Sequence, residues 1–587
     1  MARPAGRLRW RVVSRDGDGF VQAPSAKPPL SRPHDPAFAC LATQPLAPRP
    51  SARYSLGDKE GGMSHPGIDS LRPHERPMFP GSPATPDFAL PVRVAYGCVG
   101  VLLAFTSAMG TALITVNLPS IQGTLGLDPA QASWLPTAYV MTSVSMNLIL
   151  VKFRQQYGLR LFVQLALGTY LAAAVAHLFV NDFASALVVR AASGVAAAPL
   201  TTLATFYLLQ AFPAARRLSA FVLAFGVPLV ATPLARCISP DLLELGQWRT
   251  LYLLELALVL ITLSAVLALR LPPSERLKVF EWADFVTYPL IAIGLALVCA
   301  VLGQGRLEWW FSTPWLGVAL AVAAVLIIAA LTLEWHRKNP LLDLRWAITP
   351  DFIGFILIAF LTRVLLIEQN GGAAGLLTVL GMGQEQTRSL YVVIALATLA
   401  GAVVGALTIS PKTVFFQIMV AVVLIGAAAY IDSHSNNLTR PAQLYVSQAM
   451  LGFATALVLA PTLLIGFVQV LQRGWRSFPT LIVSFAVAQN LGALFSAALS
   501  QTFQYDRMRF HYAHLVGQLD PTVPFVADRL RAGPAAIVGQ ATREANILAY
   551  NDLFLLLFVI AVLTLVGTAI FTLRAIAKMK AAQRAAS

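Results

Sequence analysis

Two charged side chains, Arg190 and Glu255, lie at similar depth in separate apolar runs. A basic and an acidic side chain placed in this way could respond to the binding of a proton. Arg190 lies about six residues, roughly 9 Å at 1.5 Å per residue, inside its run. Glu255 lies about five residues inside another run, from the corresponding end. An ionised group within an apolar run is costly, so each is a candidate functional residue. We expect Arg190 to hold Glu255 ionised until protonation frees it; the alternatives are a static pair or a Glu255 in the headgroup zone.

A second group of polar side chains, close to the middle of later runs, is suited to binding a ligand. Arg363 and Glu368 are five residues apart, a turn of about 140° around a helix, so they are poor partners for each other. Arg363 is therefore a candidate anion-binding residue, with a structural ion pair as the alternative. Gln489 and Asn490 could bond a substrate or join neighbouring helices. We expect Glu368, near the end of its run, to lie on a wet rim without function.

Composition shows which solvent surrounds these residues. The chain has 587 residues, of which 57% are apolar and 12% charged, against about 25% charged in an average soluble protein. Beyond residue 92 the sequence contains about fourteen apolar runs of about 20 residues, each long enough to cross the bilayer core as a helix. The runs are 94–116, 132–151, 160–180, 184–208, 217–236, 250–270, 284–303, 315–334, 352–371, 388–409, 413–431, 442–469, 477–502 and 551–574.

The placement of Lys and Arg predicts the orientation. Basic residues gather in the loops after even-numbered runs, whereas residues 117–131 and 181–183, after odd-numbered runs, contain none. The positive-inside rule then places both termini in the cytoplasm. Much of the net charge of +15 serves orientation, so the expected partner is the lipid bilayer, and a nucleic-acid partner loses its main support.

The first 90 residues differ from the rest of the chain. They hold 15 of the 37 prolines and no sustained hydrophobic period, which predicts a disordered tail. Translation from Met63 or Met78 is the alternative interpretation. We expect residues 91–272 and 346–587 to form two helical bundles, joined by two membrane helices in 273–345, with an external loop over 503–550.

The sequence gives little support to an enzyme or a channel. It contains no HExxH, GxxxxGK[ST] or DDxxD motif, and its four cysteines are far apart. We therefore expect no catalytic residue, cofactor or metal site. Nor does it show a repeated filter motif or a ring of charge. Polar groups in helices interrupted by Gly and Pro favour a transporter with a central cavity.

One motif carries a specific resemblance. The segment Thr115-Val-Asn-Leu-Pro-Ser-Ile-Gln-Gly-Thr-Leu-Gly resembles the "NVALP-x-I" signature of the major facilitator superfamily, and within it the fourteen-helix drug:H⁺ antiporters of the EmrB/QacA type. Further matches follow in the family's order over roughly residues 94–575: Ser133-Trp134 with Tyr139, Arg190 with Gly194, Gly226 with Pro228 and Pro233, Gln247-Trp248-Arg249 with Tyr252, and Gln489-Asn490-Leu-Gly492.

The resemblance implies an all-α major facilitator fold: two six-helix bundles around a cavity, with two helices inserted between them. It implies proton-driven export of a small organic molecule across a bacterial inner membrane. Related exporters in double-membrane bacteria work with a periplasmic adaptor and an outer-membrane channel, so these are candidate partners. Uptake or facilitated diffusion, and a non-transporting sensor on the same fold, are the alternatives.

Departures from the family pattern mark a divergent member. The Asp usual in the first helix is Gly110, and Glu255 stands where Asn is common. The loop after the second helix keeps Gly158 and Arg160 but has Gln155 at the usual Asp position. The resemblance implies a role in conformational change for six residues: Gly158, Arg160, Gly194, Gly226, Pro228 and Pro233.

Overall fold

The computed structural model describes residues 72, 74–79, 81–244, 249–337, 339–410, 413–474, 477–520 and 522–586. Fourteen helices in these ranges are long and apolar enough to cross a membrane, which confirms the predicted all-α polytopic class. The pair Gln247-Trp248 and the alternative start Met63 lie outside the described residues.

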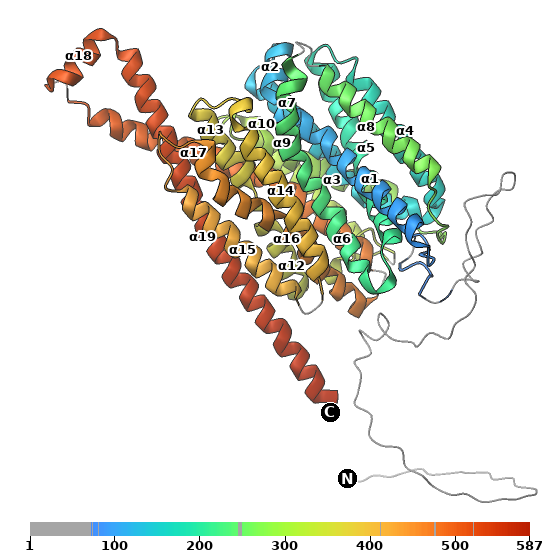
Figure 1. Cartoon of the computed structure of the whole chain (residues 1–587). Helices are drawn as coiled ribbons and strands as arrows, with labels where there is room; N and C mark the ends of the chain where they lie inside the picture. The colour runs from blue at the N-terminus through green and yellow to red at the C-terminus, as the bar shows by residue number, and fades with distance from the viewer. Residues whose placement is uncertain are drawn as a thin grey trace, which may run out of the picture. The chain divides into compact units, whose positions relative to one another are not determined.

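The spans fall into two bundles and an inserted pair (Figure 1). The first bundle contains α1 (Leu90–Val116), α3 (Pro129–Tyr157), α4 (Leu159–His177), α5 (Phe183–Ala211), the broken span α6 (Arg217–Gly226), η4 (Val227–Val230) and α7 (Ala231–Glu244), and α8 (Thr250–Ala268). The inserted pair is α9 (Asp284–Gln304) and α10 (Pro314–Trp335). The second bundle contains α12 (Pro350–Leu365) with η5 (Glu368–Ala373) and α13 (Ala374–Val379), α14 (Gln384–Thr408), α15 (Val414–Asp432), α16 (Tyr445–Arg473), α17 (Phe478–Gly517) and α19 (Pro534–Ala586).

Local sequence explains where the helices of the first bundle begin and end. Asp128 caps α3 through a capping box with Gln131, and Pro129 follows at the first helical position. At the other end of α3, Gly158 has φ +84°, a conformation that favours glycine. Asp182 caps α5 in the same way as Asp128 caps α3. These signals place both ends of α3 and the start of α5.

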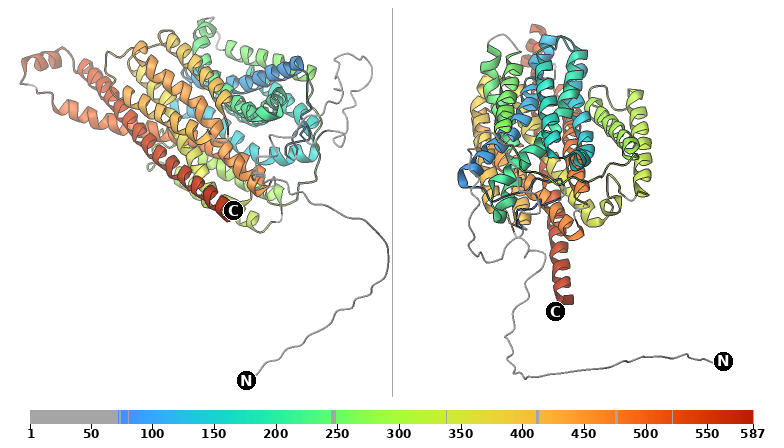
Figure 2. Two further views of the ribbon diagram at one scale, coloured as in Figure 1. Left: turned by 60° about the horizontal axis from the view of Figure 1, so that its bottom comes forward. Right: turned by 90° about the vertical axis from the view of Figure 1, so that its right-hand side faces the viewer.

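Helix contacts join the spans within each bundle and between them. In the first, α5 packs against α1, α3 and α4; in the second, α16 packs against α14 and α15. The helices α9 and α10 pack on each other, and α9 packs on α3, so the pair stands at the side of the first bundle (Figure 2, right). Between bundles, α14 contacts α6 and α7, and α17 contacts α3. Helix α9 also packs on α17 of the second bundle, and the direct contacts between the bundles come from α3, α6, α7, α14, α16 and α17.

The membrane helices have two opposite ends, each named after a glycine that lies there. The Gly158 end holds Gly158 and the segment 269–283, which meet where the N–H of Leu277 bonds the carbonyl of Gln155 at 2.8 Å. The Gly126 end holds Gly126 and Asn117, at the opposite end of α1 and α3.

Residues 503–550, predicted as an external loop, are largely helical. The helix α17 continues to Gly517, α18 (Pro524–Ala532) follows, and α19 begins at Pro534. Figure 1 shows α17 and α19 running on side by side to α18, beyond the other helices. An ion pair supports this extension, with Arg507 Nε 2.6 Å from Asp552 Oδ2. Helical pairing satisfies backbone groups that a loop would leave to water.

Some of the segment predicted to be disordered is ordered. Residues 74–79 and 81–89, called the strap, pack at the Gly158 end. The N–H of Ala84 bonds the carbonyl of Pro273 at 3.0 Å, and Gln210 donates to the carbonyl of Ala84 at 3.0 Å. Phe79 is 4% exposed and its ring stacks on Phe478 at 4.2 Å. Backbone hydrogen bonds and one buried ring hold this segment without any hydrophobic period.

Candidate functional site: a central cavity and buried charges

A cavity lies between the two bundles, with about 1660 Å³ of empty space including the part open to solvent. Its walls come from α1, α3, α5, α6 and η4 of the first bundle, from α12, α16 and α17 of the second, and from the strap. The polar and charged lining residues are Ser107, Tyr139, Ser143, Asn147, Arg154, Thr201, Thr202, Thr205, Arg363, Gln489 and Asn490. Among the described lining residues none is acidic.

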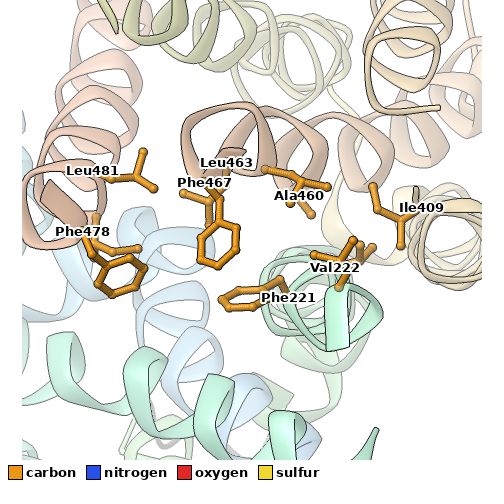
Figure 3. A pocket seen from close by; sticks show the side chains of 11 residues that line it. Phe221, Val222, Ile409, Ala460, Leu463, Phe467, Phe478 and Leu481 are labelled. Carbon is orange, nitrogen blue, oxygen red and sulfur yellow. The ribbon is translucent and has the colours of Figure 1, made fainter. Parts of the chain in front are cut away.

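A narrow apolar crevice adjoins the cavity. In Figure 3, Phe221 and Val222 of α6 face Ala460, Leu463 and Phe467 of α16 across it. The crevice and the cavity share Phe221, Leu463, Phe478 and Ile482. Every side chain that lines the crevice is a hydrocarbon, so it continues the cavity as a purely apolar surface between the bundles.

The structure brings together the three residues predicted to bind substrate. Arg363 of α12 lines the cavity beside Gln489 and Asn490 of α17, where α17 approaches so closely that a Cβ on Gly492 would lie 3.1 Å from Arg363 Cβ. Gln489 donates to the carbonyl of Ala359 at 3.0 Å, so its amide also joins α17 to α12. The Arg363 guanidinium makes no hydrogen bond or ion pair to any described residue. No structural ion pair explains Arg363 within the described ranges.

Arg154, one of the basic residues that follow the apolar run 132–151, also lines the cavity. It is 3% exposed near the end of α3, with Cζ 4.7 Å from the ring centre of Phe206 and 5.9 Å from that of Phe79. Its Nε and one terminal nitrogen have no hydrogen-bond partner among the described residues. Two aromatic faces thus hold a second cation without a described counter-ion at the Gly158 end of the cavity.

Glu255 lies in the interior of the first bundle, not in a headgroup zone. It is 4% exposed, and its Oε2 lies 3.0 Å from Nδ1 of His177, a residue absent from the predicted site. The contact has the distance of an ion pair without the alignment of a hydrogen bond. His177 is 1% exposed and stacks on Tyr252 with ring centres 4.8 Å apart. His177 lies near the end of the predicted run 160–180, and nothing in the sequence links it to Glu255.

The space beside Gly110 belongs to the Glu255 carboxylate. A Cβ on Gly110 would lie 2.5 Å from Glu255 Oε1 and 2.8 Å from the Tyr170 hydroxyl. The resemblance expects an Asp at Gly110. In this chain α8 delivers a carboxylate to the same place that α1 would otherwise supply.

Arg190 lies near this carboxylate but is not its ion-pair partner. Its Cζ is 4.8 Å from the ring centre of Tyr139, and Nε and one terminal nitrogen have no hydrogen-bond partner among the described residues. Glu255 and Tyr139 are both close enough to Arg190 to interact with it electrostatically. Tyr139 also lines the central cavity, so the same residue contacts both the cavity and the Arg190 guanidinium.

The predicted conformational residues fall on helix crossings and breaks. A Cβ on Gly194 would meet the Tyr139 carbonyl, and one on Gly226 would lie 2.9 Å from Ala402 Cβ, so each glycine allows a close approach between helices. Pro228 lies in η4, the 3₁₀ turn that interrupts the fifth span, and lines the cavity. Pro233 lies in α7.

The other two conformational residues lie at the Gly158 end. A Cβ on Gly158 would lie 2.6 Å from Arg276 Nε, whereas Arg160 is exposed. The roles of all six residues in motion remain predictions.

A charge network ties the inserted helices to α3 at the Gly158 end. Lys152 Nζ is 2.8 Å from Asp284 Oδ1, and Arg337 is 2.7 Å from the same oxygen. Burial opposes the charge of Arg337, but hydrogen bonds to Asp284, Glu281 and Glu334 outweigh it and raise its pKa. Hydrogen bonds from Asn339 and Arg337 lower the pKa of Glu281. This network fastens α9 and α10 rather than facing the cavity.

The expectation of a wet rim at Glu368 is wrong. Glu368 is 0% exposed and Asp432 1% exposed, and both accept from the amide of Gln448, at 3.0 and 2.8 Å. The ninth span continues through the π-helical turn η5 and α13 to Val379, so Glu368 is far from its end. The two carboxyl groups also lie within hydrogen-bonding reach of each other. No described cation pairs with either of them.

The bundles meet directly at the Gly126 end. Arg388 of α14 forms a two-pronged contact with Asp241 of α7, at 3.0 and 2.7 Å. Gln384 donates to Asn117 at 3.3 Å, and Arg236 lies over the Tyr391 ring at 4.9 Å. The cavity therefore extends from the middle of the helices towards the Gly158 end and not through these contacts.

One group of described residues could offer three ligand atoms to a metal. His74, Glu75 and Asp87 of the strap place these atoms within 4.8 Å of one another. Both Glu75 oxygens already accept backbone N–H groups, from Arg72 and Asp87. The group therefore serves to close the strap on itself.

A cavity between two six-helix bundles agrees with the sequence comparison. Residues 100–497 match the sequence profile of the Major Facilitator Superfamily. The chain belongs to this superfamily. It is a divergent, EmrB-like member and a multi-pass membrane protein, as the motifs predicted.

The curated relatives of this facilitator are distant. The fatty acid resistance protein FarB of Neisseria gonorrhoeae is 25% identical over 41% of this chain and 48% of its own length. The multidrug export protein EmrB of Escherichia coli (strain K12) is 24% identical over 41% and 47%. The chain thus spans about half the length of the curated relatives it matches.

Solved structures resemble the facilitator in fold. The human organic anion transporter MFSD10 matches with a TM-score of 0.52 at 12% identity, over 80% of this chain and 99% of that one. A POT family transporter in complex with 5-aminolevulinic acid matches with a TM-score of 0.52 at 14% identity, over 84% and 99%. At such identities the likeness concerns the fold alone.

Proposed function

We propose that this facilitator exports small organic molecules across a bacterial inner membrane, driven by inward flow of protons. The observation that carries the proposal is the position of Tyr139. Its ring lines the cavity on one side and lies under Arg190, beside the Glu255–His177 pair, on the other. A change of charge on Glu255 is thereby one side chain away from a bound substrate.

Proton binding at Glu255 would change the charge balance around Arg190 and His177. The carboxylate and His177 are buried together, and the guanidinium of Arg190 lies close by. Protonation of Glu255 removes the negative charge beside the guanidinium of Arg190, and this buried cation then favours a new position. Because Arg190 rests on Tyr139, its movement alters the wall of the cavity. In this scheme Glu255 carries the proton, and Arg190 transmits the change.

The direction of transport follows from orientation in this proposal. The excess of Lys and Arg assigns the Gly158 end to the cytoplasm. The cavity extends towards that end, while Arg388 and Asp241 hold the bundles together at the other. Substrate would enter from the cytoplasm and leave when the bundles rock about the cavity. The names of the relatives, a fatty acid resistance protein and multidrug export proteins, fit this direction.

A partner outside the membrane would meet the extension made by α17, α18 and α19. In the proposed orientation this extension projects from the outer face. It offers exposed apolar side chains, among them Phe510 and Phe525. A periplasmic adaptor leading to an outer-membrane channel remains the candidate partner from the resemblance.

Everted membrane vesicles from overexpressing cells provide the test. A pH gradient, acid inside, is followed with acridine orange while acids, dyes and antibiotics are added in turn. We expect some compounds to dissipate the gradient through the wild-type chain and none through Glu255→Gln. Glu385→Gln, an exposed carboxylate at the start of α14, is the matched control and should behave as wild type.

Four results would contradict the proposal in different ways. Accumulation against the opposite gradient would indicate uptake, and equilibration without proton movement would indicate facilitated diffusion. Binding of a compound that never crosses the membrane would indicate a sensor. Undiminished proton-driven transport by Glu255→Gln would remove Glu255 from the mechanism while leaving the transport function standing.

A further inference from the structure

The cavity carries two cations and, among the described lining residues, no acid. We infer that its ligand is an amphipathic organic anion, with one acidic head group on an apolar body. The inference rests on the proposed transport function, because it assigns a substrate class to the same cavity.

Arg363 has no counter-charge among the described residues. Arg363 lines the cavity, and its guanidinium has no hydrogen-bond or ion-pair partner among the described residues. Removing a cation from bulk water without a partner is expensive, and an acidic group that binds it bidentately recovers much of that cost. Gln489 and Asn490 line the cavity beside it, and each side-chain NH2 uses one N–H within the protein, so its second N–H can donate to the same head group.

Arg154 is a second cavity-lining arginine without a described counter-ion, and it lies nearer the Gly158 end. Arg363 lies thirteen residues beyond the start of α12, which is ~20 Å along the helix. Arg154 lies three residues before the end of α3, ~5 Å from the same side of the membrane. A molecule that enters from the Gly158 end therefore meets one unpaired guanidinium and then, about 15 Å further in, another. Two such positions suit the passage of one negative charge.

Much of the remaining wall of the cavity is apolar. Phe225, Leu459 and Phe485 line the cavity, and the crevice of Figure 3 adds Val222 and Phe467. Such walls bind the hydrocarbon body of a ligand by removing it from water. A small hydrophilic anion would gain nothing from them, which restricts the class to anions with an aromatic or aliphatic body.

The same arrangement disfavours lipophilic cations. A cationic head group would face Arg363 and Arg154 with no described carboxylate in the wall to offset the repulsion. An unpaired like charge at a binding site is an effective way to reject a ligand. We therefore expect discrimination by head-group charge among molecules with one common body.

Three fluorescent probes with one body test this expectation: pyrenebutyrate, pyrenebutanol and a pyrenebutyl trimethylammonium salt. Binding to the full chain in lipid nanodiscs is measured by energy transfer from the protein tryptophans to pyrene. We expect the anion to bind at least about tenfold more tightly than the other two, as for a hydrogen-bonded ionic contact. Nonspecific partition into lipid is measured with nanodiscs that contain no protein.

Four variants locate the contact. Arg363→Gln should lose the preference for the anion by about tenfold or more, and Arg363→Lys, which keeps the charge, should retain some of it. Arg154→Gln should lose less, because Phe79 and Phe206 cover that cation. Arg345→Gln, an exposed arginine outside the cavity, should match wild type.

Equal binding of the anionic and cationic probes, or an unchanged preference in both Arg363→Gln and Arg154→Gln, would overturn the inference. These binding measurements need no gradient. Failure here would leave proton-driven export untouched, and loss of proton-driven transport would leave the binding preference untouched.

Discussion

The two bundles bury acidic side chains in different surroundings. In the first, Glu255 faces the imidazole of His177 at 3.0 Å and lies near the guanidinium of Arg190. In the second, Glu368 and Asp432 share the amide of Gln448, and no described cation pairs with either. Two buried carboxyl groups in hydrogen-bonding reach satisfy each other only if one of them supplies a proton. The first arrangement sets a carboxylate beside a cation, whereas the second sets two carboxyl groups against one shared amide.

The largest effect is expected from moving the carboxylate of the first bundle. Glu255→Ala should reduce proton-driven transport by about a hundredfold, the scale of breaking a buried ion pair. Adding Gly110→Asp to Glu255→Ala should restore some of it, because residue 110 borders the same space. Gradient dissipation in everted vesicles measures both. A double variant no better than Glu255→Ala would show that the carboxylate must come from α8.

His177 should matter next, through stability. His177→Ala leaves Glu255 buried without its neighbour and removes the stack on Tyr252, so we expect a loss of about 3 kcal/mol. Thermal unfolding in detergent measures the loss. Pairing His177→Ala with Glu255→Gln should recover stability but not transport. A single variant as stable as wild type would mean that His177 is no partner of Glu255.

The carboxyl pair of the second bundle should tolerate neutralisation. Glu368→Gln replaces a group whose hydrogen bonds an amide can imitate, so stability should change by no more than about 1 kcal/mol. Proton-driven transport should persist, in contrast to Glu255→Gln. Glu368→Ala, which leaves the Gln448 amide with fewer acceptors, is the matched comparison and should be less stable. If Glu368→Gln abolished proton coupling and Glu255→Gln did not, the proton-carrying carboxyl group would lie in the second bundle and not in the first.

The smallest effect is expected outside the membrane, at Glu281. Hydrogen bonds from Asn339 and Arg337 favour its ionised form and lower its pKa. The stabilisation is therefore present at neutral pH, above the pKa of the unfolded chain, and is lost as the pH falls through the lowered value. Glu281→Gln should cost less than about 1 kcal/mol at pH 7 and nothing in strong acid. Melting temperatures across this pH range measure the difference, and a cost that grew in acid would reverse the sign.

The fold was more predictable than the site because its signal is local. All fourteen spans follow from apolar runs, since any helix in lipid must satisfy its own backbone. The positions of Arg363, Gln489 and Asn490 on the cavity also follow, because polar groups at mid-depth must face a cavity or another helix. These inferences need only one helix at a time.

The features that were missed depend on contacts between helices. The depth of Glu368 was misjudged because the span was expected to end at residue 371, whereas its helix continues through a π-helical turn. His177 acquires its importance only from Glu255, seventy-eight residues later in the chain. The strap has no hydrophobic period, and its order comes from hydrogen bonds to distant carbonyls and amides. Spacing along a sequence carries none of this information.

The attachment of the strap is unequal on its two sides. Hydrogen bonds join it to Gln210, Arg217 and Pro273, which belong to the first bundle or its connection, whereas Phe79 touches the second through the ring of Phe478. Any opening between the bundles at this end must therefore separate these two stacked rings while the strap travels with the first bundle. The contact between Phe79 and Phe478 therefore closes this end of the cavity, and the distance between residues 79 and 478 measures how far the two bundles have separated there.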